Sequence, residues 1–376
     1  MVYLDNSATT RVSEEAAREA FRCMRESYGN PSSLHLFGSQ AEAILKEARR
    51  SLAFALTCSP EEIVFGSGGT ESDNQALIGA YMAKRREGNK IITSAVEHPA
   101  VLETMKYLEE QGADVTYVDV GEDGKVKASD FLRMVDEKTI LVSLMSINNE
   151  TGAVMPVEEI FRACPHVIRH TDAVQALGKI PLAHTGADLL SVSGHKIHAP
   201  KGCGALYIRR GIHLPPLIRG GGQEKGQRSG TENLPALSAF GLAARKAEEK
   251  RKERVDIMRR LRDRLLQNIC DQIPDIRVNS PEDACPAILN ISFLGTRAEV
   301  IVHRLEQKGI MVSTGSACSS RQGGSRVLRA MGLDQDRVAS ALRFSFSHEN
   351  TEEEMDYTAD CLAEAVSRFR RLGAFR

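Results

Sequence analysis

The sequence predicts an α/β protein with a mainly parallel sheet, helices on both faces of that sheet, and a smaller α+β unit. Between residues 62 and 209, short apolar runs alternate with segments of helical spacing, and strands separated by helices pair in parallel. Residues 234–273 form a long, highly charged helical segment, after which this alternation stops. We therefore expect a large domain over residues 13–250 and a small domain from residues 1–12 with 251–376.

The individual elements follow from local patterns. Residues 1–12 are extended, and Ser13 is the expected N-cap of a helix that runs to about residue 27. The alternating region contains seven expected strands, at 62–65, 90–94, 114–120, 139–146, 167–171, 188–193 and 204–209. Further expected helices span 38–56, 69–84, 99–111, 128–135, 157–163 and, as one unbroken helix, 234–273. The last part contains expected strands at 287–293, 311–313 and 341–346, and expected helices at 297–308 and 351–370.

Composition excludes several classes of protein. The chain has 49 basic and 50 acidic residues, so no surface for nucleic acid is indicated. No apolar run reaches the roughly 18 residues of a membrane helix, and the N-terminus lacks the features of a secretory signal. The eight cysteines are scattered without a CxxC pair, which favours reduced thiols and a cytoplasmic location.

Lys196 is the first candidate for a functional residue. It follows the apolar run 188–193 and Gly194, at the end of an expected buried strand. Ligands of open α/β sheets bind at the carboxyl ends of strands, where a desolvated lysine is a usable nucleophile. A surface lysine remains the simpler interpretation of this residue by itself. The neighbouring His195 and His198 do not suffice for a metal site, because no further ligands accompany them.

Two other strand ends carry compatible chemistry. Residues 65–72, FGSGGTES, lie between a strand and a helix, where glycine amides and the Thr70 hydroxyl suit a single phosphate, although a tight connection is an equal alternative. Asp172 ends another apolar strand, either as a helix N-cap or as the partner of a protonated ring nitrogen. A phosphate loop, an acid and then a lysine are the three contacts that pyridoxal phosphate requires.

With these three features in this order, the chain resembles the cysteine desulfurases, which are fold-type I pyridoxal phosphate enzymes of the aminotransferase class V group. The resemblance runs nearly from end to end and favours the iron–sulfur-cluster-type subgroup. The motifs that carry it are Tyr3–Thr10, Gly29–Ser33, Gly69–Ser72, Glu97–His98, Asn148–Gly152, His170–Gln175, Ser193–Lys196, Gly221–Thr231, Ser313–Cys318 and Arg343–Ser345.

The resemblance implies a role for each matching residue. Lys196 is bonded to the cofactor and moves a proton between Cα and C4′, and Asp172 pairs with the ring nitrogen. His98 stacks on the pyridine ring and is a catalytic residue that acts in acid–base steps. Gln175 and Asn149 lie near the phenolic oxygen, and Asn149 and Arg343 bind the substrate carboxylate. The implied phosphate ligands are Gly69, Thr70, Ser193, His195 and, from the other subunit of a homodimer with shared active sites, Thr231.

Cys318 is the remaining candidate. It lies among small polar residues, in a composition typical of a mobile loop, and Arg321 nearby would favour its thiolate. The other seven cysteines are mostly in apolar or helical contexts and are expected to be structural. The resemblance implies that Cys318 takes sulfur from L-cysteine as a persulfide, releases L-alanine, and passes the sulfur to an acceptor. The acceptor would be an iron–sulfur scaffold protein or a tRNA-thiolation enzyme.

Two features qualify this interpretation. The chain ends at residue 376, without the C-terminal tail that docks the scaffold in the best-known members, which leaves the acceptor open. The long segment after Cys318 favours direct transfer without an activator protein. Alternatives are another pyridoxal phosphate enzyme, such as an aminotransferase or a selenocysteine lyase, and a non-catalytic scaffold for sulfur transfer.

Overall fold

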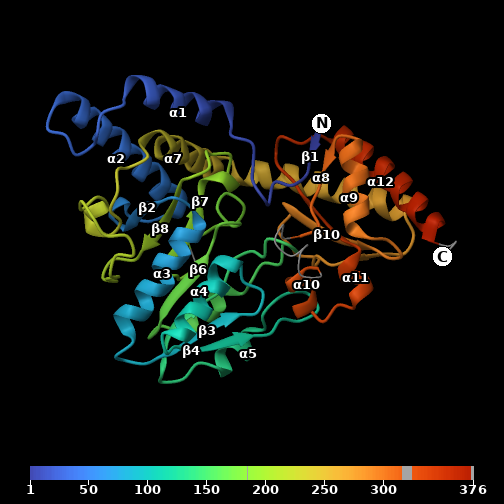
Figure 1. The fold of residues 1–376 in the computed structure, drawn as a ribbon, viewed down its shortest axis with the longest axis horizontal. Helices are drawn as coiled ribbons and strands as arrows, with labels where there is room; N and C mark the ends of the chain where they lie inside the picture. The colour runs from blue at the N-terminus through green and yellow to red at the C-terminus, as the bar shows by residue number, and fades with distance from the viewer. Residues whose placement is uncertain (184, 316–323, 374–376) are drawn as a thin grey trace.

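The structure is a computed structural model that describes residues 1–183, 185–315 and 324–373. Its centre is a seven-stranded sheet with the strand order β2-β8-β7-β6-β5-β3-β4 (Figure 1). The strands are β2 (Ile63–Gly66), β3 (Lys90–Ser94), β4 (Asp114–Val118), β5 (Thr139–Ser143), β6 (Ile168–Asp172), β7 (Leu189–Ser193) and β8 (Gly204–Ile208). All pairings except those of β8 are parallel, which confirms the predicted α/β fold with a mainly parallel sheet.

β8 runs antiparallel to both of its neighbours, β7 and β2. The expectation of parallel pairing was wrong for this strand, because no crossover helix separates it from β7. The connection contains only the short 3₁₀ helix η2 (Gly194–Lys196). A parallel neighbour requires a crossover of a dozen or more residues, so the chain turns back instead. Lys196 therefore lies in a tight connection between two central strands.

The sheet is covered on both faces, and alternate residues of each strand face opposite cores. Leu141 and Leu189 belong to a cluster with α3 and α4, whereas Val142 and Leu190 belong to the larger cluster on the other face. The helices of the large unit are α1 (Glu14–Glu26), α2 (Leu36–Leu56), α3 (Gly69–Lys84), α4 (Pro99–Glu110), α5 (Ala128–Arg133), α6 (Val157–Ala163) and α7 (Leu234–Glu249). α7 packs against α1 and α2, and Figure 1 shows these three helices grouped together at one end of the molecule.

A smaller unit holds the C-terminal part of the chain together with the N-terminus (Figure 1). Its antiparallel sheet consists of β9 (Ile276–Val278), β10 (Ile288–Phe293) and β12 (Ala341–Ser345), and β1 (Val2–Tyr3) pairs with β11 (Ile310–Met311). Its helices are α8 (Arg251–Gln272), α9 (Ala298–Gln307), α10 (Arg326–Ala330), α11 (Gln335–Ala339) and α12 (Glu352–Gly373). These pairings support the predicted division into two domains, which we retain as a proposal.

The predicted single helix over residues 234–273 is two helices, α7 and α8, which meet at Lys250. Lys250 has φ −104° and ψ 13°, outside the helical range, although neither glycine nor proline is present there. The physical reason is tertiary, because the two halves pack on different partners: α7 on α1 and α2, and α8 on α12.

None of the helices within residues 1–183, 185–315 and 324–373 combines the length and the apolar composition needed to cross a membrane.

The close packing of α7 on α2 generates a prediction about stability. A Cβ atom added at Gly241 would lie 2.6 Å from the Cα atom of Ala48 in α2. Because backbone cannot move aside as a side chain can, Gly241→Ala is expected to lower the free energy of unfolding by about 1–3 kcal/mol. Urea denaturation followed by circular dichroism measures this loss.

Gly79→Ala in α3 is the matched control, since its Cβ atom would meet only the side chain of Leu214, at 3.1 Å. We expect this variant to stay within about 1 kcal/mol of the parent protein, because alanine also favours the helix. Equal losses in the two variants would contradict the argument from backbone contact.

Candidate functional site

A cavity of about 360 Å³ lies at the carboxyl ends of β6 and β7. Its position follows the rule for open α/β sheets. The structure brings together at this cavity ten of the twelve residues singled out in the sequence. They are Gly69, Thr70, His98, Asn149, Asp172, Gln175, Ser193, His195, Lys196 and Arg343.

Lys196 reaches the cavity from η2, directly after β7. Its Nζ atom donates hydrogen bonds to the backbone oxygens of Ser7 and Ala8, the latter at 2.9 Å. Burial, and then the nearby basic groups of Lys179 and Arg343, lower the pKa of the Lys196 amine to about 7. The amine is therefore available in its uncharged, nucleophilic form near neutral pH.

Buried carboxyl groups gather on one side of the cavity. Asp172, at the end of β6, accepts a hydrogen bond from the backbone N–H of Val174 at 2.9 Å. Burial, and then the neighbouring Asp73, raise the pKa of Asp172 to about 6, while His98 opposes this rise. Burial also raises the pKa of Asp73 to about 7. Two carboxyl groups so placed favour sharing a proton over carrying two full charges.

Asp73 is a site residue that the sequence analysis missed. Its Oδ1 atom is buried without a hydrogen-bond partner among the described residues, and it lies 3.5 Å from Nε2 of His170. The signal that could have found it is helical spacing. Asp73 lies three and four positions after Thr70 and Gly69, so it occupies the same face of α3. Without the fold, an aspartate in the first turns of a helix is unremarkable.

The start of α3 lies at one end of the cavity. Gly68 caps this helix without a side-chain hydrogen bond, so the first backbone N–H groups stay available. A Cβ atom at Gly69 would lie 2.6 Å from Cγ2 of Val174, which explains the glycine. Ser193 and His195 line the same cavity, and Nδ1 of His195 lies 3.2 Å from Oγ1 of Thr9. The arrangement suits a phosphate group.

Arg343 closes the cavity from the small unit. It projects from β12 and is buried, with 3 % of its surface exposed. Its Nη2 atom donates to Oδ1 of Asp5 at 2.7 Å, and Nη1 donates to the backbone oxygen of Asn149 at 3.0 Å. Its Nε atom has no partner among the described residues. Arg343 is thus oriented and retains an unpaired donor, as a carboxylate ligand requires.

His98 and Gln175 complete the walls. His98 is the N-cap of α4, and its Nδ1 atom accepts a hydrogen bond from the N–H of Ala100 at 3.1 Å. That bond places the proton of the neutral ring on Nε2, and burial lowers the pKa of His98. The Gln175 amide donates from Nε2 to the backbone oxygen of Ser7 at 2.9 Å. Both side chains are therefore held in fixed orientations.

The two remaining predicted site residues are Thr231 and Cys318. Thr231 lines a separate cavity of about 210 Å³ together with Glu224 and Arg228. Cys318 and Arg321 lie outside the described residues. Among the other seven cysteines five are buried and Cys58 is partly buried, but Cys270 is exposed, so one thiol departs from the expected structural context.

The fold and this cavity define a fold-type I transferase, with a lysine, a buried carboxylate and a helix N-terminus at one sheet edge. The family model for aminotransferase class V matches residues 2–358. A cysteine desulfurase of Gluconacetobacter diazotrophicus is 43% identical over 383 residues, covering 100% of this chain and 95% of the relative. The cysteine desulfurase IscS of Clostridium botulinum is 40% identical, covering 99% of this chain and 96% of the relative.

Among solved structures, a NifS-like protein superimposes with a TM-score of 0.92 at 40% identity, over 98% of this chain and 99% of its own. The chain belongs to the aminotransferase class V family and, within it, to the cysteine desulfurases. The family resemblance predicted from the sequence motifs is confirmed.

The buried pair Asp73 and Asp172 generates a prediction about pH. The pKa of Asp73 is raised in the folded protein, so its stabilising contribution is complete below the unfolded-state pKa and is lost as pH rises through about 7. Asp73→Asn mimics the protonated form. In the cofactor-free protein we expect this variant to be more stable than the parent at pH 8, on the order of 1–3 kcal/mol.

The stability difference between Asp73→Asn and the parent protein should decrease steadily as the pH falls from 8 to 5. Thermal denaturation at several pH values measures this difference. Asp263→Asn, at an exposed position of α8, is the control and should show no such trend. A pH-independent effect of Asp73→Asn would contradict the protonation argument.

Proposed function

We propose that this protein is a pyridoxal phosphate-dependent cysteine desulfurase that converts L-cysteine to L-alanine and donates the sulfur to an acceptor. The observation that carries the proposal is one cavity that combines Lys196, Asp172, the start of α3 and Arg343. The lysine, the acid and the helix N-terminus suit the aldehyde, the ring nitrogen and the phosphate of the cofactor. The arginine suits the carboxylate of an amino acid substrate. The full-length relatives named cysteine desulfurases support the substrate.

The residues present fit the cofactor. Lys196 would bond to its aldehyde, Asp172 would pair with the ring nitrogen, and His98 would stack on the ring. Gln175 and Asn149 would face the phenolic oxygen. The phosphate would be held by Gly69, Thr70, Ser193 and His195, with Thr231 of the second subunit. When bound, pyridoxal phosphate supplies an electron sink that weakens bonds at Cα and Cβ of an amino acid.

Arg343 and Lys196 have different roles toward the substrate, which are binding of its carboxylate and transfer of its proton. Arg343, fixed by Asp5, binds the α-carboxylate and so orients the amino acid. The Lys196 amine, with its pKa lowered to about 7, would accept the proton from Cα of the substrate and deliver it to C4′ of the cofactor. Asp172 is buried in the cavity, where its carboxylate would stabilise a positive charge on the ring nitrogen that faces it.

Cys318 is proposed as the sulfur acceptor within the protein. Its thiolate attacks the substrate sulfur, an S–S bond forms, and the Cβ–S bond breaks. The electron pair of the broken bond stays on Cβ, which takes up a proton, so alanine and a Cys318 persulfide result. Two observations support this role: the sequence surrounding Cys318, and Gly315, which lies three positions before it and lines the cavity.

The persulfide sulfur would then pass to an acceptor protein, either an iron–sulfur scaffold or a tRNA-thiolation enzyme. A homodimer with shared sites and a cytoplasmic location complete the proposal. The thiols of the seven described cysteines are free, which is compatible with a reducing compartment.

The first test is spectroscopic and chemical. We expect the purified protein to be yellow and, with L-cysteine and a thiol reductant, to form sulfide and alanine in equal amounts. Cys318→Ala should keep the absorption band but lose product formation by roughly 10³-fold, because the sulfur has no acceptor. Cys270→Ala removes an exposed thiol and is the matched control, expected within about twofold of the parent.

Each other outcome identifies an alternative. A yellow protein without sulfide formation would indicate another amino acid substrate, as in an aminotransferase. Full turnover by Cys318→Ala would remove the persulfide step and favour a selenocysteine lyase. A protein that stays colourless after addition of pyridoxal phosphate would leave only the non-catalytic scaffold.

The shared site is tested by complementation. Lys196→Ala should be inactive, and Thr231→Ala should weaken cofactor binding by about 10–100-fold through loss of a charge-assisted hydrogen bond. Co-expression of both variants, assayed at limiting cofactor, should restore about one quarter of the parent activity, because half the dimers hold one intact site. Activity no higher than that of the separate variants would show that Thr231 acts within its own subunit or not at all.

A further inference from the structure

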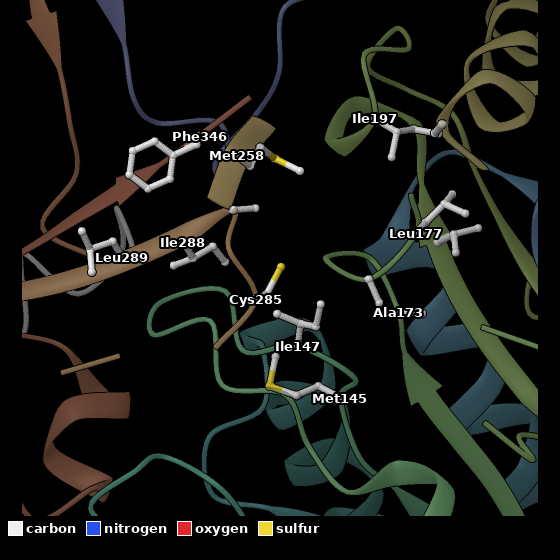
Figure 2. Close-up of a cluster of buried hydrophobic side chains, with 14 of the residues drawn as sticks. Met145, Ile147, Ala173, Leu177, Ile197, Met258, Cys285, Ile288, Leu289 and Phe346 are labelled. Carbon is white, nitrogen blue, oxygen red and sulfur yellow. The ribbon is translucent and has the colours of Figure 1, made fainter. Parts of the chain in front are cut away.

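A second, smaller cavity of about 40 Å³ lies on the other side of Lys196. Its walls come from both units of the fold. Figure 2 shows Met258 and Phe346 on one side of this region and Leu177 and Ile197 on the other. The proposed function assigns nothing to this cavity, which shares only Lys196 and Ser7 with the larger one.

The lining of this cavity contains three basic side chains. Lys179, Lys196 and Arg254 all line it, and no carboxylate occurs among the described residues of its walls. Glu349 lies outside the wall, 3.9 Å from Nδ1 of His198, and 40% of its side chain is exposed to solvent. Burial lowers the pKa of Lys179 and of Lys196 and so opposes their charged forms, which a negative ligand in the cavity would stabilise.

Several polar groups of the walls are already paired. Nδ1 and Nε2 of His198 lie 2.9 and 3.1 Å from the backbone oxygen of Arg11 and Oγ of Ser347. Nζ of Lys179 donates to the backbone oxygen of Gln175 at 3.0 Å and to Oε1 of the same residue at 3.4 Å, which leaves one further N–H donor when the group is protonated. These groups fix the shape of the cavity.

Arg254, in the wall of the same cavity, has an unpaired hydrogen-bond donor within the described part of the chain. Its Nε atom is buried and has no hydrogen-bond partner among the described residues. A buried guanidinium N–H without an acceptor destabilises the protein, and more so because the group is charged. An anion inside the cavity would supply the missing acceptor and reduce the repulsion between Lys179 and Lys196.

The volume restricts the ligand. A single water molecule needs about 10–15 Å³ of such space, so the cavity admits a monatomic ion but not an amino acid or a nucleotide. We propose that this cavity binds a small inorganic anion of the size of chloride, held by Lys179 and Arg254. The anion joins the two units of the fold next to the active lysine. The proposal does not depend on the desulfurase activity.

The direct test uses bromide as the probe. Crystals of the purified full-length protein soaked in sodium bromide should show an anomalous peak between Lys179 and Arg254. Absence of a peak there, with bromide bound elsewhere on the surface, would overturn the proposal.

The solution test compares sodium bromide and chloride with sodium gluconate at equal ionic strength. Gluconate is too large for the cavity, so the halides should raise the melting temperature by about 2–4 °C relative to it. Arg254→Gln should abolish this difference. Arg259→Gln, an exposed arginine of the same helix that pairs with Asp256, is the matched control and should retain it.

If Arg254→Gln does not fold, Lys179→Gln replaces it with the same expectation. A halide effect of equal size in the parent protein and in a cavity variant would assign the stabilisation to other surfaces and refute the site.

Discussion

The hydrogen bonds from Lys196 to the backbone oxygens of Ser7 and Ala8 tie the whole site to the N-terminal segment. The same segment contacts the small unit, because Asp5 forms an ion pair with Arg343 and its backbone forms an isolated β-bridge with Ser345. The lysine that follows a strand of one sheet and the arginine in a strand of another are therefore oriented by one short stretch of chain. The site exists only when both units and this segment are assembled.

This arrangement places Lys196 between regions of opposite charge. Buried carboxyl groups, including Asp73 and Asp172, lie on the side of the larger cavity. Lys179 and Arg254 lie on the side of the smaller one. Burial raises the pKa of the two carboxyl groups and lowers the pKa of Lys179 and Arg254, because the charged forms are costly in the protein without ligands. Functional sites commonly retain such costs because a ligand of the complementary charge removes them on binding.

The antiparallel direction of β8 determines where Lys196 lies. A short connection between β7 and β8 holds Lys196 close to the sheet, whereas a crossover helix would have carried it to one face. Close packing at this turn is shown by Gly204, whose added Cβ atom would lie 2.6 Å from Cα of Gly68. The start of α3 and the Lys196 connection are thus adjacent, which brings the anion-binding and nucleophilic ends of the cavity together.

Much of this could be predicted from the sequence because it depends on local patterns. Strand β3 and helix α6 begin and end where their apolar spacing predicts, and Ser13 caps α1 through its side chain. Lys196 and Asp172 were found because each follows an apolar strand, and parallel strands present their carboxyl ends at one edge. The shortest elements, such as β9 and α11, were missed since a few residues carry no periodicity.

The sequence by itself determined the fold class, the family and the identity of Cys318 as a candidate, because motifs and composition are properties of the chain alone. Only the tertiary structure decided the break at Lys250 and the antiparallel course of β8. It also decided that Asp73, Lys179 and Arg254 matter, since a charged residue becomes informative only when its burial and its neighbours are known. Those neighbours come from segments far apart in the chain, and no local pattern records them.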